Sequence, residues 1–160
     1  MALPNPDALL KDLQVKWPGT QIALEGNVFI VPAAELTKVA RFLRDTEPYV
    51  CDYLSNLTAT DDLERKEMAV VYHLYSMAKK HGPITLKVRL PRDQASVASV
   101  TPLWRGAEFQ EREVYDLFGV TFTGHPDLRR ILMWDEFVGH PMRKDYVDED
   151  QDAPNTPPLR

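Results

Sequence analysis

The amino-acid sequence predicts an α+β fold: a small mixed or antiparallel sheet packed with helices, followed by an extended C-terminal arm. Helical and strand patterns are partly segregated along the 160 residues, which fits this class better than a doubly wound parallel sheet. Residues 84–90 alternate between apolar and polar side chains, as half-buried strands do. Beyond residue 124 the periodicity fades and five prolines accumulate. We therefore expect a compact α+β domain over residues 1–123 and an arm over residues 124–160.

A first helix is expected to begin at Pro6 and to end before the Pro-Gly pair at residues 18–19. Asn5 suits the N-cap position, and proline is favoured at the first helical position. Leu10, Leu13 and Trp17 then fall on one face of this helix. That face is the side we expect to pack on the domain core.

A hairpin and a second helix follow. The hairpin strands carry Ile22, Leu24, Val28 and Ile30 on either side of a turn at residues 25–27. Pro32 opens the helix and Pro48 blocks its continuation. Its apolar face recurs at helical spacing through Leu36, Val39, Ala40 and Leu43.

Three strands are predicted next, because apolar side chains recur at every second position. The first has Cys51, Tyr53, Ser55 and Leu57 on one face. The second has Met68, Val70, Tyr72 and Leu74 on one face. The third has Ile84, Leu86, Val88 and Leu90 on one face.

Two helices are expected after the strands. Asp93 can cap a short helix over residues 95–100, which Pro102 interrupts. A longer helix over residues 103–118 ends at Gly119, a residue type favoured just past a helix C-terminus. This helix is expected to bury Ala107, Val114, Leu117 and Phe118.

Composition excludes several classes of protein. A net charge of −5 argues against non-specific nucleic-acid binding, which needs a basic surface. Cys51 is the one cysteine, so this chain alone cannot hold a cysteine-ligated iron–sulfur cluster or form an internal disulfide. No apolar run approaches the roughly 18 residues of a membrane span, and the N-terminus lacks a signal-peptide pattern. We expect a cytoplasmic protein that meets a membrane only through partners.

Residues 111–146 are the most informative stretch: EREVYDLFGVTFTGHPDLRRILMWDEFVGHPMRKDY. It is dense in charge, Gly-His-Pro turns and aromatic side chains, yet it lacks a nucleophile–base pair and a glycine-rich phosphate loop. Such a composition indicates a docking surface more than an active site. The motif and interface residues that we expect to matter are Glu111, Arg112, Glu113, Asp116, His125, Pro126, Arg129, Arg130, Trp134, His140, Pro141, Arg143, Lys144, Asp145 and Tyr146.

The order and spacing of these motifs resemble the C-type subunit of the proton-pumping NADH:quinone oxidoreductase, respiratory complex I, in its free-standing bacterial form. The resemblance is specific over residues 111–146 and diffuse over the first hundred residues. It implies a structural subunit without catalytic residues, bracing the quinone-reducing module of the peripheral arm. It also implies that FMN, iron–sulfur clusters, NADH and quinone belong to other parts of the holoenzyme, and that no cofactor is held by this chain.

The resemblance further implies partners and a location. The neighbours would be the D-type and B-type subunits of complex I, on the cytoplasmic face of the bacterial inner membrane. Alternatives stay open: an equivalent scaffold component of a membrane-bound hydrogenase or of a ferredoxin- or F420-linked complex, or a stand-alone metal enzyme that uses histidines and carboxylates.

The charged helix has two interpretations. Glu108–Arg112 and Arg112–Asp116 stand at i,i+4 spacing, so these side chains could form a solvated face with weak ion pairs. With the resemblance we favour a partly buried network in which Arg112 binds carboxylates in a bidentate manner. Glu111 and Glu113 face different sides of the helix, which argues against a paired-carboxylate hydrolase.

His125 and His140 each stand in a Gly-His-Pro turn, where a structural role is expected. A metal site would need further ligands such as Asp127 and Asp135, and the two histidines lack helical HxxxH spacing. The metal interpretation is therefore the weaker of the two.

An apolar strip, Ile131-Leu132-Met133-Trp134 with Phe137, lies between two basic doublets. Nearby acidic residues neutralise the doublets, which argues against nucleic acid. Apolar and aromatic side chains rimmed by arginine are typical of protein interfaces. The arm is expected to be either disordered or laid over another protein.

Overall fold

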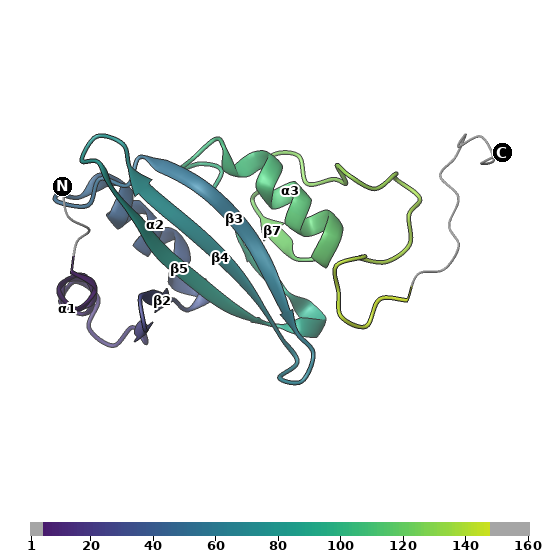
Figure 1. Cartoon of the computed structure of the whole chain (residues 1–160), viewed down its shortest axis with the longest axis horizontal. Coiled ribbons are helices and arrows are strands. Elements are labelled where there is room, and N and C mark those ends of the chain that lie inside the picture. Colours follow the sequence, from purple (N-terminus) through teal and green to yellow (C-terminus); the bar gives the residue numbers. More distant parts are fainter. Residues whose placement is uncertain (1–4, 148–160) are drawn as a thin grey trace.

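A computed structural model of the chain describes residues 5–147 and shows the α+β fold that the sequence predicts (Figure 1). Residues 148–160 of the arm lie outside the described residues. The elements in chain order are α1 (Pro6–Lys16), β1 (Ala23–Glu25), β2 (Val28–Ile30), a 3-10 turn η1 (Ala33–Glu35), α2 (Leu36–Asp45), β3 (Tyr53–Asp62), β4 (Glu67–Ser76), β5 (His81–Pro91), a 3-10 turn η2 (Arg92–Gln94), β6 (Ser96–Ala98), α3 (Ala107–Phe118) and β7 (Thr121–Thr123).

The central sheet is mixed, which is one of the two forms that the sequence predicts. Its strand order is β1-β2-β5-β4-β3, with β2 parallel to β5 and all other neighbours antiparallel. The hairpin of β1 and β2 turns at Gly26, which adopts a left-handed φ of 62°. A separate pair, β6 and β7, is parallel.

One face of the central sheet forms the core. The predicted apolar faces of β4 and β5 are confirmed, since Met68, Val70, Tyr72 and Leu74, and likewise Ile84, Leu86, Val88 and Leu90, are buried. The predicted face of α2 is confirmed as well, because Leu36, Val39, Ala40 and Leu43 are fully buried. Helix α2 lies behind the sheet in the view of Figure 1.

Strand β3 differs from the prediction. Tyr53 is 49% exposed, and Leu54 is buried instead. The register shifts between Leu54 and Asn56, so an irregularity of the bulge type moves one residue out of the alternation. The prediction that Tyr53 lies on the buried face is therefore wrong, and Ser55 lies at the irregularity and is only partly buried.

Residues 95–100 do not form the predicted helix. Ser96–Ala98 is extended as β6 and pairs in parallel with β7, which the sequence analysis missed. The strand that pairs with β6 is β7, which follows α3 in the chain. The sequence around residues 95–100 alone therefore does not reveal this pairing. The following helix begins at Ala107 rather than at Leu103, and it ends at Gly119 as predicted.

Helix α1 begins as predicted, with the side chain of Asn5 accepting a hydrogen bond of 2.9 Å from the Asp7 N–H. Its buried residues are Leu9 and Leu13, whereas Leu10 and Trp17 are only partly buried. The prediction is thus confirmed for Leu13, whereas Leu9, and not Leu10 or Trp17, is the other fully packed residue.

Helix α3 covers the β3 edge of the sheet. The side chain of Gln110 accepts the backbone N–H of Leu57 at 2.5 Å. After β7, residues 124–147 run past the C-terminal end of α3 without forming a helix or strand (Figure 1). This helix therefore connects the sheet to the arm.

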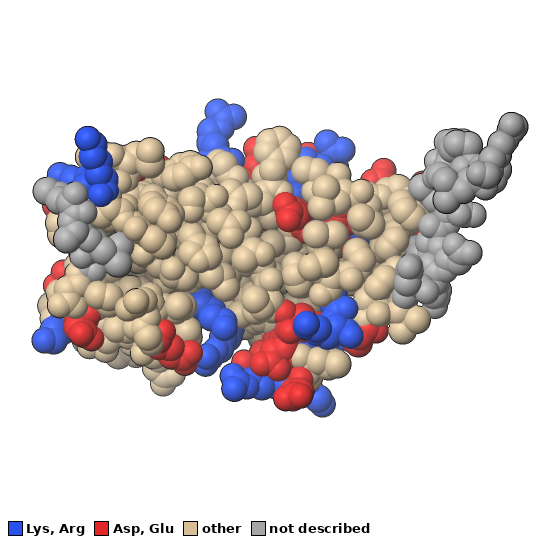
Figure 2. Space-filling view, in the orientation of Figure 1, with Lys and Arg blue, Asp and Glu red and all other residues tan. Residues whose placement is uncertain are grey.

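Charge is unevenly distributed over the molecular surface. In the view of Figure 2, lysine, arginine, aspartate and glutamate lie at the left end and along the upper and lower edges, most densely along the lower edge. The centre of this face, over the strands of Figure 1, is largely uncharged. Basic and acidic groups lie close together along the lower edge, so no extended basic surface is visible on this face.

Candidate functional site

The motif residues of α3 are partitioned between the core and the solvent. Glu111 and Asp116 are fully buried, and Arg112 is 7% exposed. Glu113 is exposed. The helix therefore directs two carboxylates and one guanidinium inward, and the interpretation of a fully solvated charged face is wrong.

Asp116 is the anchor of the arm. Its Oδ2 accepts hydrogen bonds from three consecutive backbone N–H groups, those of Ile131 (3.0 Å), Leu132 (2.7 Å) and Met133 (2.8 Å). Its Oδ1 lies 2.5 Å from the guanidinium of Arg130. Consecutive N–H groups converging on one oxygen form an anion-binding nest, so the arm folds around this carboxylate.

The environment of Asp116 keeps its carboxyl group ionised. Burial raises its pKa, but hydrogen bonds from the backbone of residues 131–133 and from Arg130 outweigh burial, so the pKa is lowered from its ordinary value. A charged acceptor strengthens each of these bonds relative to a neutral one. The connection between α3 and the arm is therefore electrostatic as well as geometric.

Arg112 does not bind carboxylates in the predicted bidentate manner. Its Nε donates to the carbonyl of Arg129 at 3.2 Å, and one terminal nitrogen donates to the carbonyl of Arg130 at 3.0 Å. The carboxylate that comes nearest is that of Asp127, at 4.0 Å. The guanidinium group of Arg112 thus binds two backbone carbonyls of the arm. These hydrogen bonds take the place of the expected ion pairs with Glu108 and Asp116.

The arm also caps the C-terminus of α3. The backbone carbonyl of Asp116 accepts a hydrogen bond of 2.9 Å from Nδ1 of His140. The carbonyl of Leu117 accepts one of 3.0 Å from the N–H of Met142. The carbonyl of Phe118 accepts Nε of Arg143 at 2.7 Å. The last carbonyls of a helix have no hydrogen-bond partner within the helix itself. The positive charges of Arg130 and Arg143 are in addition attracted to the negative end of the helix dipole.

Glu111 anchors the chain segment before α3. Its carboxylate accepts the Ser99 hydroxyl at 2.6 Å and the Val100 N–H at 2.7 Å. Burial raises the pKa of Glu111 to about 7, although both hydrogen bonds oppose this shift. A group that titrates near neutrality is thus placed between the segment after β6 and the helix.

His125 lies against the same buried carboxylate. Its Nδ1 accepts the Asp127 N–H at 3.0 Å, so its Nε2 donates to the Glu108 carbonyl at 3.0 Å. Nε2 is also 4.0 Å from Glu111. Both ring nitrogens hold the Gly-His-Pro turn, which is the structural role that we predicted.

A second anchor was missed by the sequence analysis. Arg92 is 7% exposed and binds both oxygens of Asp61, at 2.7 and 2.9 Å, and both oxygens of Asp145 in the arm. The backbone N–H of Lys144 donates to Asp61 at 2.8 Å. A signal did exist, because Asp61 continues the buried positions Leu57 and Ala59, where a carboxylate needs a partner.

The aromatic residues of the arm pack on one another. Trp134 meets Phe137 edge to face with ring centroids 4.8 Å apart, and Phe137 stacks on Tyr146 at 6.1 Å. All three are partly buried. Trp134 is therefore a packing residue of the arm as well as a candidate contact residue.

The remaining predicted residues lie at the surface. Pro126, Arg129 and Lys144 are exposed, and Pro141 is partly buried. Arg129 forms an exposed ion pair of 2.9 Å with Asp127. Their role in partner contacts stays a prediction.

The described residues contain no group of three or more histidine, cysteine, aspartate or glutamate side chains placed to hold a metal ion. Within residues 5–147, no helix has the length and apolar character needed to cross a membrane.

The geometry defines a class of protein: an α+β domain that binds an ordered but irregular segment against its last helix.

Comparisons with known proteins place this class in a family. The sequence model of the respiratory-chain NADH dehydrogenase 30 kDa subunit matches residues 29–152. The chain belongs to that family.

Individual relatives agree with this assignment. The C subunit of the NADH-quinone oxidoreductase of Roseiflexus castenholzii is 44% identical over 150 residues, covering 91% of this chain and 85% of the relative. The protein of the same name from Moorella thermoacetica is 40% identical over 142 residues, covering 88% of this chain and 94% of the relative.

Two solved structures share the fold. A trypsin-resistant fragment of Nqo5 (residues 1-134) has a TM-score of 0.54 and 30% identity, covering 76% of this chain and 98% of that one. A polypeptide of the archaeal membrane-bound sulfane sulfur reductase has a TM-score of 0.70 and 24% identity, covering 93% and 96%. The second likeness concerns the fold alone.

Proposed function

We propose that this chain is a structural subunit of a proton-translocating NADH:quinone oxidoreductase, and that it braces the quinone-reducing module of the peripheral arm. The family and the names of its relatives support a place in that complex. The bracing role rests mainly on one observation: Asp116 fixes the backbone of residues 131–133, next to side chains that remain exposed.

These side chains form the candidate contact surface. Phe109 is 61% exposed, Leu132 57% and Ile131 36%. Phe109 lies beside the guanidinium of Arg112, 5.9 Å from ring centroid to Cζ, and Arg112 holds the carbonyls of residues 129 and 130. A surface ordered before binding loses less conformational entropy when the partner docks.

The proposal assigns electron transfer to other chains. FMN, iron–sulfur clusters, NADH and quinone would be bound elsewhere in the complex, and the contacts would be with the D-type and B-type subunits. The chain would lie on the cytoplasmic face of the inner membrane as a peripheral protein. The buried charges of residues 111–116 have structural partners, which supports a role without catalytic residues here.

The test replaces Leu132 with aspartate in the host that carries the complex. Replacing Arg130 would release the arm from Asp116, so it would not isolate the contact surface. Val15→Asp is the matched control, because Val15 is 79% exposed on α1. Membranes are assayed for NADH oxidation with an artificial flavin-site acceptor and, separately, with quinone.

We expect Leu132→Asp to lower assembly or quinone reduction at least about tenfold, since central interface anchors often contribute roughly 2 kcal/mol or more. Flavin-site activity of the NADH-oxidising module should persist, and Val15→Asp should behave like the parent. Full quinone activity in Leu132→Asp would contradict the contact surface. Loss of both activities in an intact complex would contradict the structural role.

A further inference from the structure

A second exposed site lies at the α1–α2 end of the molecule, away from the arm (Figure 1). An open groove of about 490 Å³ is lined by Lys16, Trp17, Thr37, Lys38, Arg41, Phe42, Asp45 and Thr46. It shares no residue with the anchors of Asp116, Glu111 or Arg92. The surface proposed above therefore does not account for it.

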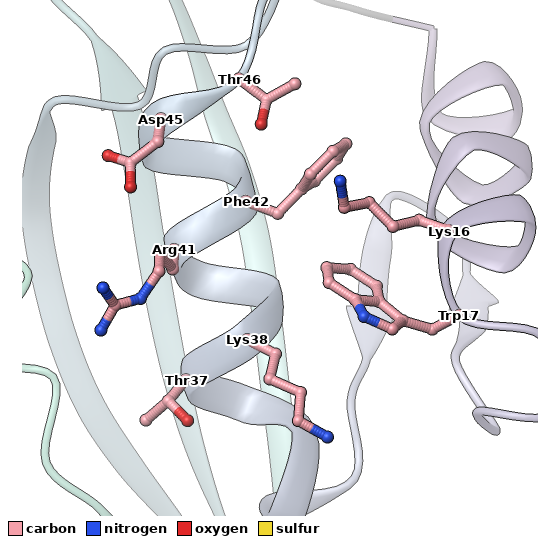
Figure 3. A pocket seen from close by; sticks show the side chains of 8 residues that line it. All are labelled: Lys16, Trp17, Thr37, Lys38, Arg41, Phe42, Asp45 and Thr46. Atoms are coloured by element: carbon pink, nitrogen blue, oxygen red, sulfur yellow. The ribbon is translucent and has the colours of Figure 1, made fainter.

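The groove is aromatic at its centre. Trp17 and Phe42 meet edge to face, with ring centroids 5.6 Å apart and planes at 78°. Both rings are partly exposed. In Figure 3 they come from opposite walls, Trp17 from the end of α1 and Phe42 from α2, and point toward one another. The two rings therefore form one continuous apolar surface that a ligand can reach.

The groove is lined by three cations, Lys16, Lys38 and Arg41, and by one carboxylate, Asp45, so its lining is net positive although the whole chain carries −5. Nζ of Lys16 lies 5.2 Å from the Phe42 ring centroid and 6.0 Å from that of Trp17. Within the described part of the chain Lys16 forms no ion pair. Lys38 adds a second cation, which comes from α2 on the opposite wall in Figure 3. Its i,i+3 pair with Glu35 lies at the surface, where ion pairs are weak.

The walls of the groove are formed before any ligand arrives. The Tyr49 hydroxyl, just beyond α2, donates to Asp12 of α1 at 2.5 Å. Tyr49 also packs on Phe42, with ring centroids 5.8 Å apart. Leu9 and Leu13 hold the inner face of α1 in the core. Such preorganisation reduces the entropy that binding costs.

We propose that this groove binds an acidic protein segment in which carboxylates alternate with apolar side chains. The carboxylates would pair with Lys16 and Lys38, and an apolar side chain would lie on the Trp17–Phe42 surface. A nucleotide fits less well, because the two rings pack against each other instead of standing parallel on either side of a base. This groove is separate from the candidate contact surface on the arm and can bind a ligand whatever that surface contacts.

The test uses the full chain and a fluorescein-labelled synthetic peptide of alternating Glu and Leu, with binding followed by fluorescence anisotropy. Two further peptides replace Leu by Ser or Glu by Lys. The groove variant is Lys16→Glu/Lys38→Glu. The matched control is Lys11→Glu/Arg105→Glu, which makes the same change in charge at exposed positions outside the groove.

We expect the groove variant to bind the Glu/Leu peptide about tenfold or more weakly than the parent and the control variant, as two exposed ion pairs would imply. The Ser and Lys peptides should bind the parent more weakly as well. Leu132→Asp should bind the Glu/Leu peptide as the parent does, which separates this site from the arm.

Three results would overturn the proposal. If the Ser peptide bound as tightly as the Glu/Leu peptide, binding would depend on charge alone and the two rings would contribute nothing. Equal weakening by the control variant would show that binding is not localised to the groove. Tighter binding of ATP than of the Glu/Leu peptide would assign the groove to a nucleotide.

Discussion

Gly119 and His140 approach each other so closely that a Cβ atom on the glycine would lie 2.5 Å from Nε2 of the imidazole. Gly119 also has a left-handed φ of 75°, which side chains of L-residues rarely adopt. One position thus ends α3 and lets the arm return over the helix terminus.

We expect Gly119→Ala to lower the free energy of unfolding by about 2 kcal/mol or more, through backbone strain and displacement of His140. Gly124→Ala separates the two causes, because Gly124 has a φ of 82° but nothing within 4 Å of its added Cβ. Urea unfolding of both variants gives the comparison. Equal losses would show that the contact with His140 adds nothing.

Asp116→Asn should loosen the arm. The amide keeps one acceptor oxygen but places an NH2 group toward Arg130 or toward the N–H nest, and removal of one partner of a buried ion pair costs about 3–5 kcal/mol. Hydrogen exchange should then show loss of protection at the amides of residues 131–133. Glu113→Gln, an exposed position on the same helix, should leave both stability and protection unchanged.

Arg92→Met should destabilise the domain by about 3 kcal/mol, because it leaves the buried Asp61 carboxylate without its cation. Arg89→Met is the matched control. Arg89 pairs with Glu25 at 2.7 Å with both side chains substantially exposed, so it should cost about 0–1 kcal/mol. Thermal unfolding of the two variants measures the difference, and equal losses would contradict a buried anchor.

Glu111 should make stability depend on pH between about 4.5 and 7. Its pKa is raised from 4.5 to about 7, so the folded state holds a proton that the unfolded chain has released. Stability must therefore fall as pH rises through this interval, by roughly 3 kcal/mol in total. The lowered pKa values of Asp61 and Asp116 act in the opposite direction and below about pH 4.

Glu111→Gln should remove this dependence and exceed the parent in stability at pH 8. Its amide can still accept the Val100 N–H and donate to the Ser99 hydroxyl. The difference between variant and parent isolates Glu111, because the lowered pKa of His140, caused mainly by burial, affects both proteins. A constant difference between pH 5 and pH 8 would contradict the raised pKa.

Much of the fold could be predicted because β4, β5 and α2 carry regular apolar periods that match their burial. The errors have local causes. The irregularity near Ser55 adds a residue that strict alternation cannot anticipate. Strand β6 acquires its partner only after α3 has turned the chain back.

Some of the residues that hold the arm could be named from the sequence, but their contacts could not. Arg112 is buried as expected, yet its acceptors are main-chain carbonyls, which side-chain patterns do not reveal. Arg92 meets Asp145 across 53 positions, a distance over which spacing carries no information. The arm was expected to take its order from partners, whereas residues 124–147 are already tied to α3 and Asp61 by the chain's own groups.

The hydrogen bond from Leu57 to Gln110 has a consequence for the protein before it joins its complex. Edge strands with free N–H groups recruit strands from other molecules and so lead to aggregation. At one edge of the sheet α3 lies over β3, and at the other edge β1 is only three residues long. Both edges of the sheet therefore offer little free backbone for pairing with a strand of a second copy.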